Sequence, residues 1–189
     1  MRILGIDPGT AIVGYSVIDF EKGKYKVLDY GCIYTDKDED MPVRLEEIYD
    51  GLDNIIKLWK PSDMAIEELY FFKNQKTIVK VGQARGVITL VGQKNNMNIY
   101  SYTPLQVKMG IASYGRAEKK QIQEMVKIIL GLEEIPKPDD AADALAIAIT
   151  HINSKNGFGG FSRGDNITKK LEKLNSNKIK LSDYKKLMG

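Results

Sequence analysis

The chain has 189 residues, of which 43% are hydrophobic and 28% are charged. This length suits one domain, or one domain plus a tail, and the apolar content is enough for a core, which excludes disorder throughout and a fibrous repeat. No apolar stretch of the sequence approaches the roughly 18 residues that cross a bilayer, and its opening does not resemble a signal peptide. We therefore expect a cytoplasmic protein with no membrane partner.

Charge is distributed unevenly along the chain. Residues 155–189 hold nine Lys or Arg against three Asp or Glu, a net charge of +6, whereas the residues before them carry a net charge of −3. A glycine-rich stretch after Ser154 breaks all periodicity. We expect a folded domain over residues 1–153 and a basic, flexible tail over residues 154–189, which either contacts phosphates nonspecifically or only aids solubility.

The order of predicted elements indicates an α/β fold. Runs of β-branched and aromatic residues between turn signals predict strands over residues 1–7, 12–20, 24–35, 63–69 and 98–102. Apolar residues at three- and four-residue steps predict helices over residues 41–60, 75–94, 104–111, 117–130 and 140–153. Short connections favour an antiparallel meander of the first three strands. The whole order predicts a mixed five-stranded sheet flanked by helices.

Acidic residues lie at the ends of two predicted strands. Asp7 ends the first strand in an Asp-Pro-Gly sequence, which is also an ordinary turn signal. Glu67 and Glu68 end the apolar fourth strand and point to opposite faces, so one of them faces inward unless the strand already frays there. A buried carboxylate needs a cation or strong hydrogen bonds, which favours a metal ligand or a general base at this strand end.

Three aspartates open the last predicted helix. Asp140 and Asp143 are three residues apart, and Asp139 and Asp143 are four apart, so either pair shares one helix face. Asp139 or Asp140 would make a good N-cap, but capping does not explain Asp143, one turn inside an alanine-rich helix. A carboxylate cluster in a chain with one histidine favours hard cations such as Mg²⁺ or Mn²⁺ over zinc, and two such ions can drive phosphodiester hydrolysis.

Four segments of the chain together resemble the RuvC family of Holliday-junction resolvases, in the ribonuclease H-like superfamily. They match the family in order and spacing and comprise residues 4–10, 65–67, 82–86 and 140–148. The resemblance implies that the catalytic residues, which are also the metal ligands, are Asp7, Glu67, Asp140 and Asp143. It implies that Asp7 bridges the ions and that Glu68 and Asp139 are bystanders.

The resemblance also implies an activity and its partners. It implies a magnesium-dependent endonuclease with two ions per subunit, for which Mn²⁺ can substitute. Such an enzyme acts in DNA recombination and repair as a homodimer, and it resolves four-way junction DNA by two symmetric nicks. A two-fold dimer with one site per subunit matches the approximate two-fold symmetry of the junction. The branch-migration proteins RuvA and RuvB are implied as partners.

Four residues are candidate DNA contacts. Lys108 and Lys119 match the family's DNA-contacting lysines, and Tyr70 falls where the family usually has a phenylalanine that stacks on bases. Arg116, in a glycine-containing loop, is a DNA contact by our own hypothesis, from its charge alone. The single cysteine, Cys32, is expected to be a small buried residue, and His151 to be structural or on the surface.

Three other readings are compatible with parts of the sequence. A ribonuclease H proper, which cuts RNA in a hybrid with DNA, would use a similar set of acids. A non-catalytic binder of branched DNA would need none of them. An actin-like or sugar-kinase-like phosphotransferase also opens with a strand ending in Gly-Ile-Asp, but it needs a second lobe that this chain lacks the length to form.

Overall fold

The computed structural model describes residues 1–68, 75–113 and 115–157. Ten elements follow one another in this part of the chain, in the predicted order and with nearly the predicted boundaries. They are β1 (Arg2–Asp7), β2 (Ile12–Glu21), β3 (Lys24–Tyr34), α1 (Met41–Trp59), β4 (Asp63–Glu67), α2 (Gln75–Lys94), β5 (Asn98–Tyr102), α3 (Pro104–Ala112), α4 (Lys119–Leu130) and α5 (Asp139–Asn156). None of the described helices is long and apolar enough to cross a membrane.

The five strands form one mixed sheet in the order β3-β2-β1-β4-β5. The first three strands pair antiparallel, because short turns connect them, and β4 and β5 add in parallel to β1 through the helical crossovers. The predicted mixed five-stranded sheet is therefore confirmed. β1 and β4 lie at its centre, so their last residues, Asp7 and Glu67, reach the same edge of the sheet.

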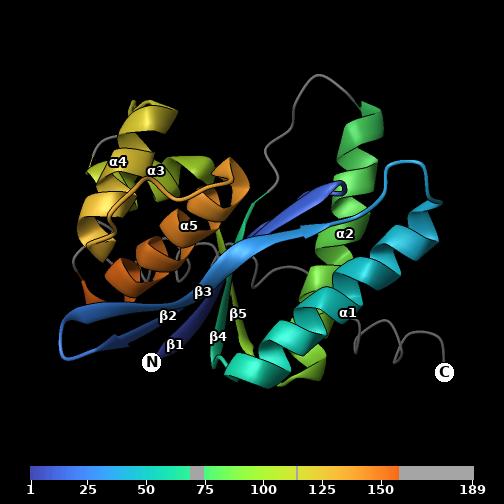
Figure 1. The fold of residues 1–189 in the computed structure, drawn as a ribbon, viewed down its shortest axis with the longest axis horizontal. Helices are drawn as coiled ribbons and strands as arrows, with labels where there is room; N and C mark the ends of the chain where they lie inside the picture. The colour runs from blue at the N-terminus through green and yellow to red at the C-terminus, as the bar shows by residue number, and fades with distance from the viewer. Residues whose placement is uncertain (69–74, 114, 158–189) are drawn as a thin grey trace, which may run out of the picture.

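Helices cover both faces of the sheet (Figure 1). One face carries α1 and α2, which pack on Leu4, Ile6 and Ile66. The other face carries α3, α4 and α5, which pack on the alternate residues Ile3 and Ala65. Since neighbouring residues of a strand point to opposite faces, Asp7 and Glu67 are directed to the α5 side, in phase with Ile3 and Ala65.

The packing of α5 on the sheet depends on glycine. A Cβ atom on Gly14 of β2 would collide with the backbone carbonyl of Asp140, and one on Gly5 of β1 would collide with the carbonyl of Ala144. Ala141, Ala144 and the other small residues of this helix are almost fully buried. Helix α5 therefore sits closer to the strands than any larger side chains would allow, and its first turn lies beside the end of β1.

Three local expectations are corrected. The N-cap of α5 is Pro138, in extended conformation, rather than Asp139 or Asp140, which form the first turn. The fourth strand ends at Glu67 instead of reaching residue 69, although the amide of Glu68 still donates to the carbonyl of Tyr102, at 2.8 Å. Helix α5 also extends through Asn156, three residues past its predicted end at Asn153.

Candidate active site

Four acidic side chains come together at one edge of the sheet, from three separate elements. Asp7 and Glu67 follow the paired residues Ile6 and Ile66 at the ends of β1 and β4. Asp140 and Asp143 come from the first and second turns of α5, which the glycine contacts hold against β1 and β2. The structure thus brings together the four acids that the sequence singled out.

The charges of these acids act on one another. Burial raises the pKa of Asp7 to about 8, with added repulsion from Glu67, then Asp143 and Asp140. Burial also raises the pKa of Glu67 to about 7, and the charge of Asp143 adds to this shift. Because Asp7 interacts with all three other carboxylates, it lies electrically at the centre of the cluster. The positive charges near the cluster do not compensate all of its negative charge.

One lysine offsets part of this charge. The Lys119 ammonium, at the start of α4, lies 3.0 Å from a carboxylate oxygen of Asp143 and 3.4 Å from one of Asp139. Burial raises the pKa of Asp143, and the hydrogen bond from Lys119 opposes that shift. Lys119 therefore draws Asp143 towards α4 while its own side chain stays 54% exposed and available to an incoming anion.

A pocket of about 180 Å³ opens beside the acids. Its polar lining consists of two acids and two cations, Glu67, Asp143, Lys108 and Lys119. Its apolar lining consists of Pro104, Val107, Ile122 and Ala146. Lys108 comes from α3, whose start is fixed by a capping box in which Thr103 accepts from the amide of Gln106 at 3.2 Å. Both family-matched lysines are thus placed next to the carboxylates.

The chemistry of this donor set fits a hard cation. In residues 1–68, 75–113 and 115–157, no three acidic, histidine or cysteine side chains gather tightly enough to hold a metal ion as they stand. However, the cluster offers carboxylate oxygens only, and burial together with repulsion from the other acids raises the pKa of Asp7. A bound divalent cation would relieve that repulsion, and oxygen donors suit magnesium or manganese rather than zinc. Asp143, now turned to Lys119, would have to rotate to join it.

The bystander acids behave differently from these four. Asp139 is exposed and, besides Lys119, accepts a hydrogen bond from Gln123 of α4, at 3.1 Å. Glu68 is exposed, whereas Glu67 is partly buried, so Glu67 is the inward-facing member of the pair. Burial therefore separates Glu67 and Asp140 from their neighbours Glu68 and Asp139.

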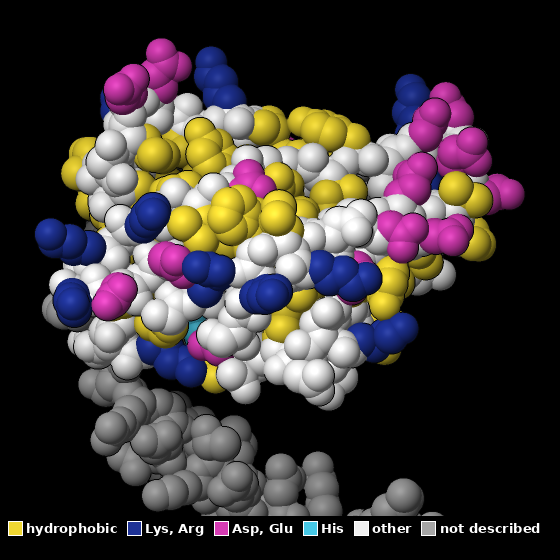
Figure 2. All heavy atoms as spheres, turned by 60° about the horizontal axis from the view of Figure 1, so that its bottom comes forward, with side chains coloured by type: hydrophobic (Ala, Val, Ile, Leu, Met, Phe, Trp, Pro, Cys, Tyr) yellow, Lys and Arg dark blue, Asp and Glu magenta, His cyan; other side chains and the backbone are white. Residues whose placement is uncertain are grey.

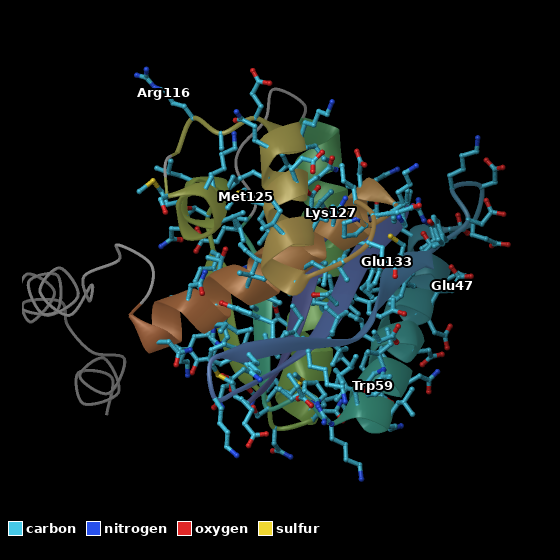
Figure 3. The ribbon with its side chains drawn as sticks, turned by 60° about the vertical axis from the view of Figure 1, so that its left-hand side comes forward. Glu47, Trp59, Arg116, Met125, Lys127 and Glu133 are labelled. Atoms are coloured by element: carbon cyan, nitrogen blue, oxygen red, sulfur yellow. The ribbon has the colours of Figure 1, made fainter. Side chains whose placement is uncertain are left out.

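The remaining predicted contacts are less closely tied to the cluster. Arg116 is exposed in the connection between α3 and α4 and points away from the molecule (Figure 3). Its position agrees with contact to a large ligand and does not place it in the pocket. Tyr70 lies outside the described residues. His151 is not on the surface: it is fully buried, at the opposite end of α5 from the acids.

Two residues of β3 near the acids were not identified from the sequence as site residues. Cys32 is partly exposed rather than buried, and it pairs in register with Gly14, beneath the first turn of α5. Burial raises its pKa, as does the charge of Asp140, while the Tyr34 side chain and the Ala141 amide hydrogen-bond to it. Tyr34 is therefore also at this edge. The alternation of β3 indicated which face Tyr34 is on, but nothing local showed that α5 would begin there.

The fold and the site together define a class of protein. A sheet of order β3-β2-β1-β4-β5, with acids at the ends of its central parallel strands and on the last helix, is the arrangement expected for ribonuclease H-like nucleases. A yeast mitochondrial Holliday junction resolvase, 17% identical, shares this fold with a TM-score of 0.58 over 79% of this chain and 76% of its own.

Closer similarities identify the family within that class. The family model for the crossover junction endodeoxyribonuclease RuvC matches residues 3–151. A protein of that name from Fusobacterium nucleatum is 58% identical over 188 residues, covering 100% of this chain and 99% of the relative. The Thermus thermophilus RuvC, solved in complex with a Holliday junction substrate, is 32% identical with a TM-score of 0.76, covering 84% of this chain and 98% of that one. The chain therefore belongs to the RuvC family of crossover junction endodeoxyribonucleases.

Proposed function

We propose that this chain resolves Holliday junctions in DNA recombination and repair, by metal-assisted hydrolysis of phosphodiesters at the carboxylate cluster. The observation that carries the proposal is the convergence of Asp7, Glu67, Asp140 and Asp143 beside a pocket lined by Lys108 and Lys119. Burial, and then repulsion from the other three acids, raises the pKa of Asp7 to about 8 there. Such a site is suited to hold cations and a phosphate together. A relative of this family, from Thermus thermophilus, is known bound to a Holliday junction substrate.

Each charged residue has a distinct part in this proposal. The acids Asp7, Glu67, Asp140 and Asp143 would hold the two Mg²⁺ ions, or Mn²⁺ in their place. When bound, these ions supply an activated water and stabilise the charge on the leaving oxygen. Lys119 and Lys108 bind the phosphate from the α3–α4 side and offset its charge. The apolar part of the pocket limits the water that can reach them.

The first experiment is a nicking assay on a mobile four-way junction in Mg²⁺, with a linear duplex and an RNA:DNA hybrid as competing substrates. We expect paired symmetric nicks in the junction, lost in Asp7→Asn and Asp143→Asn while junction binding persists. Asp139→Asn is the matched control, because Asp139 shares the helix but is an exposed bystander. Nicking that survives in Asp7→Asn would contradict the proposal. Preferred cleavage of the RNA:DNA hybrid would indicate a ribonuclease H. Junction binding without nicking would indicate a non-catalytic, architectural protein.

The exposed face of α2 supports the homodimer. Val79 is 62% exposed and Leu90 is 53% exposed. Between them, Gly82 and Gly86 have open space where a Cβ would be. These residues share one helix face, so a second copy of α2 could approach closely there. Leu90→Glu should convert a dimer to a monomer in light scattering, whereas Leu58→Glu, at a more exposed position on α1, should not. A dimer that survives Leu90→Glu would place the interface elsewhere.

The remaining parts of the proposal rest on the family and the sequence. RuvA and RuvB would deliver the junction, the protein would act in the cytoplasm, and residues 1–153 would form the nuclease domain. The basic residues 154–189 would add a nonspecific phosphate contact. Truncation after Gly157, just beyond the end of α5, should then weaken junction binding and flatten its dependence on salt concentration. An unchanged affinity and salt slope would leave the tail with a solubility role only.

A further inference from the structure

We propose that Tyr34 forms a nucleotide-binding subsite on the far side of the carboxylate cluster from the two lysines, where its ring stacks on a base next to the scissile phosphate. The inference rests on the proposed junction-nicking function and extends it to a residue that helps to position the substrate. It is carried by the position, the exposure, the rigid backbone and the electrostatic surroundings of this tyrosine.

The register of the sheet places Tyr34 at the active edge. Tyr34 pairs with Ile12, two residues beyond the pair formed by Cys32 and Gly14, and Gly14 lies against the Asp140 carbonyl. Because alternate residues share a face, Tyr34 points to the same side of β3 as Cys32, towards the start of α5. Tyr34 thus flanks Asp140 on the β3 side, while Lys119 flanks Asp143 on the α4 side.

The ring of Tyr34 is open to a ligand. Tyr34 is 62% exposed, whereas Tyr30 is 37% exposed. Tyr30 is on the same face of the same strand, four residues before Tyr34 and further from the acids. Among the described residues, no aromatic ring stacks on Tyr34. A large ring that packs so little contributes little to folding, whereas an exposed aromatic face is the usual platform for a nucleic-acid base.

The backbone that carries the ring is firmly held. The amide of Thr35 donates to the carbonyl of Ala11 at 3.0 Å, in the turn that follows Asp7. The Thr35 hydroxyl in turn accepts a hydrogen bond of 2.9 Å from the buried Arg44. The backbone of Tyr34 is therefore fixed relative to Asp7, and little backbone conformational entropy is lost when a base docks on the ring.

Charge determines which part of a nucleotide can lie there. The connection from β3 to α1 and the first turns of α1 are rich in exposed acids, namely Asp36, Asp38, Glu39 and Asp40 in the connection and Glu46 and Glu47 in the helix. Figure 2 shows acidic side chains gathered on the side of the molecule where α1 lies. These charges repel phosphate but not an uncharged base, so phosphates favour the Lys108 and Lys119 side. A base at a junction crossover has lost a stacking neighbour and so has a face free for the Tyr34 ring.

The test uses junctions that carry 2-aminopurine on the 5′ or the 3′ side of the scissile phosphate, bound without divalent ions so that no strand is cut. Stacking on an aromatic ring quenches the fluorescence of this base. The native protein and Tyr34→Phe should quench one of the two probes, and Tyr34→Ala should not. With Mg²⁺, single-turnover nicking by Tyr34→Ala should fall about tenfold. Tyr30→Ala is the matched control and should behave as the native protein.

Each other outcome has a defined meaning. Quenching and nicking unchanged in Tyr34→Ala would overturn the inference. Loss in Tyr34→Phe as well would also overturn it, because it would mean that the hydroxyl and not the ring makes the contact. An equal loss in Tyr30→Ala would reveal a general disturbance of β3. If the native protein bound or nicked no junction, the proposed function itself would fail, which the tyrosine variants alone could not cause.

Discussion

The two ends of helix α5 hold charged residues in opposite ways. At its first turns, the acids repel one another and the pKa of Asp7 is raised to about 8. At its last turns, His151 Nε2 lies 3.0 Å from Asp63 and its Nδ1 lies 2.7 Å from the Tyr102 hydroxyl. Although burial raises the pKa of Asp63, hydrogen bonds from Asn98 and His151 hold it below its usual value.

This contrast separates function from stability along one helix and one strand, because Asp63 begins β4 and Glu67 ends it. At the Asp63 end, Asp63, His151 and Tyr102 all have hydrogen-bond partners, so this end stabilises the fold. The Glu67 end leaves repulsion unrelieved and so costs stability unless cations or substrate bind. Strained charge of this kind is typical of functional sites.

The largest effect should come from disturbing the active end without touching a charge. Gly14→Ala places a Cβ against the Asp140 carbonyl, so α5 must shift. A displacement of about 1 Å can cost about a hundredfold in rate, and we expect nicking to fall by that order. Gly31→Ala, on the neighbouring strand, meets only the Tyr15 side chain, whose hydroxyl would be 3.2 Å from the new Cβ, and is the control. Full activity in Gly14→Ala would show that the acids tolerate movement of the helix.

The next effect should come from breaking the stable end. His151→Phe removes both hydrogen bonds of the buried imidazole and leaves the Tyr102 hydroxyl with one partner fewer. We expect a loss of about 2–3 kcal/mol in the free energy of unfolding, measured by urea denaturation. Nicking well below the melting temperature should be unchanged, because the acids lie at the other end of α5. A parallel loss of nicking would mean that the two ends are coupled.

A smaller effect is expected from pH in the metal-free protein. The folded-state pKa of Asp7, about 8, lies above its ordinary value of 3.8, so the fold favours the protonated form. This stabilisation is complete below the ordinary value and is lost as pH rises through 8. The free energy of unfolding should therefore fall between pH 5 and pH 8.5, by about 1–2 kcal/mol after solvent screening. In Asp7→Asn the curve should be flatter, and parallel curves for both proteins would contradict the assignment.

The smallest effect should come from Arg116, which is at neither end of α5. Arg116→Ala should lower the slope of junction affinity against salt by about one and leave the nicking rate at saturating protein unchanged. Lys127→Ala, on the last turn of α4, is a matched loss of one positive charge away from that loop. If the salt slopes of the two variants do not differ, Arg116 makes no phosphate contact.

Local signals in the sequence accounted for the active end better than for the stable one. The turn after Asp7, the end of β4 and the helical spacing of Asp140 and Asp143 are all short-range patterns, and each survives in the structure. The hydrogen bond between Asp63 and His151 joins residues 88 positions apart, so no local pattern could indicate it.

The position of Tyr34 next to the acids likewise depends on where α5 begins. That start is set by Pro138 and by packing on glycines of other strands rather than by its own aspartates. Burial also decided between neighbours, since Glu67 and Glu68 are equivalent in sequence and differ only in which way the chain turns. These features depend on long-range packing and not on residue type, so local sequence patterns could not predict them.

The glycine contacts of α5 have a consequence for how this family could diverge. Gly5 and Gly14 lie directly against backbone atoms of α5. The distance between the acids on α5 and those on the strands therefore depends on the absence of side chains at these two positions. A descendant could keep all four carboxylates and still be inactive if either glycine acquired a side chain. Loss of the enzyme during evolution would then leave its catalytic signature intact, and these two strand positions would distinguish a working nuclease from a silent descendant.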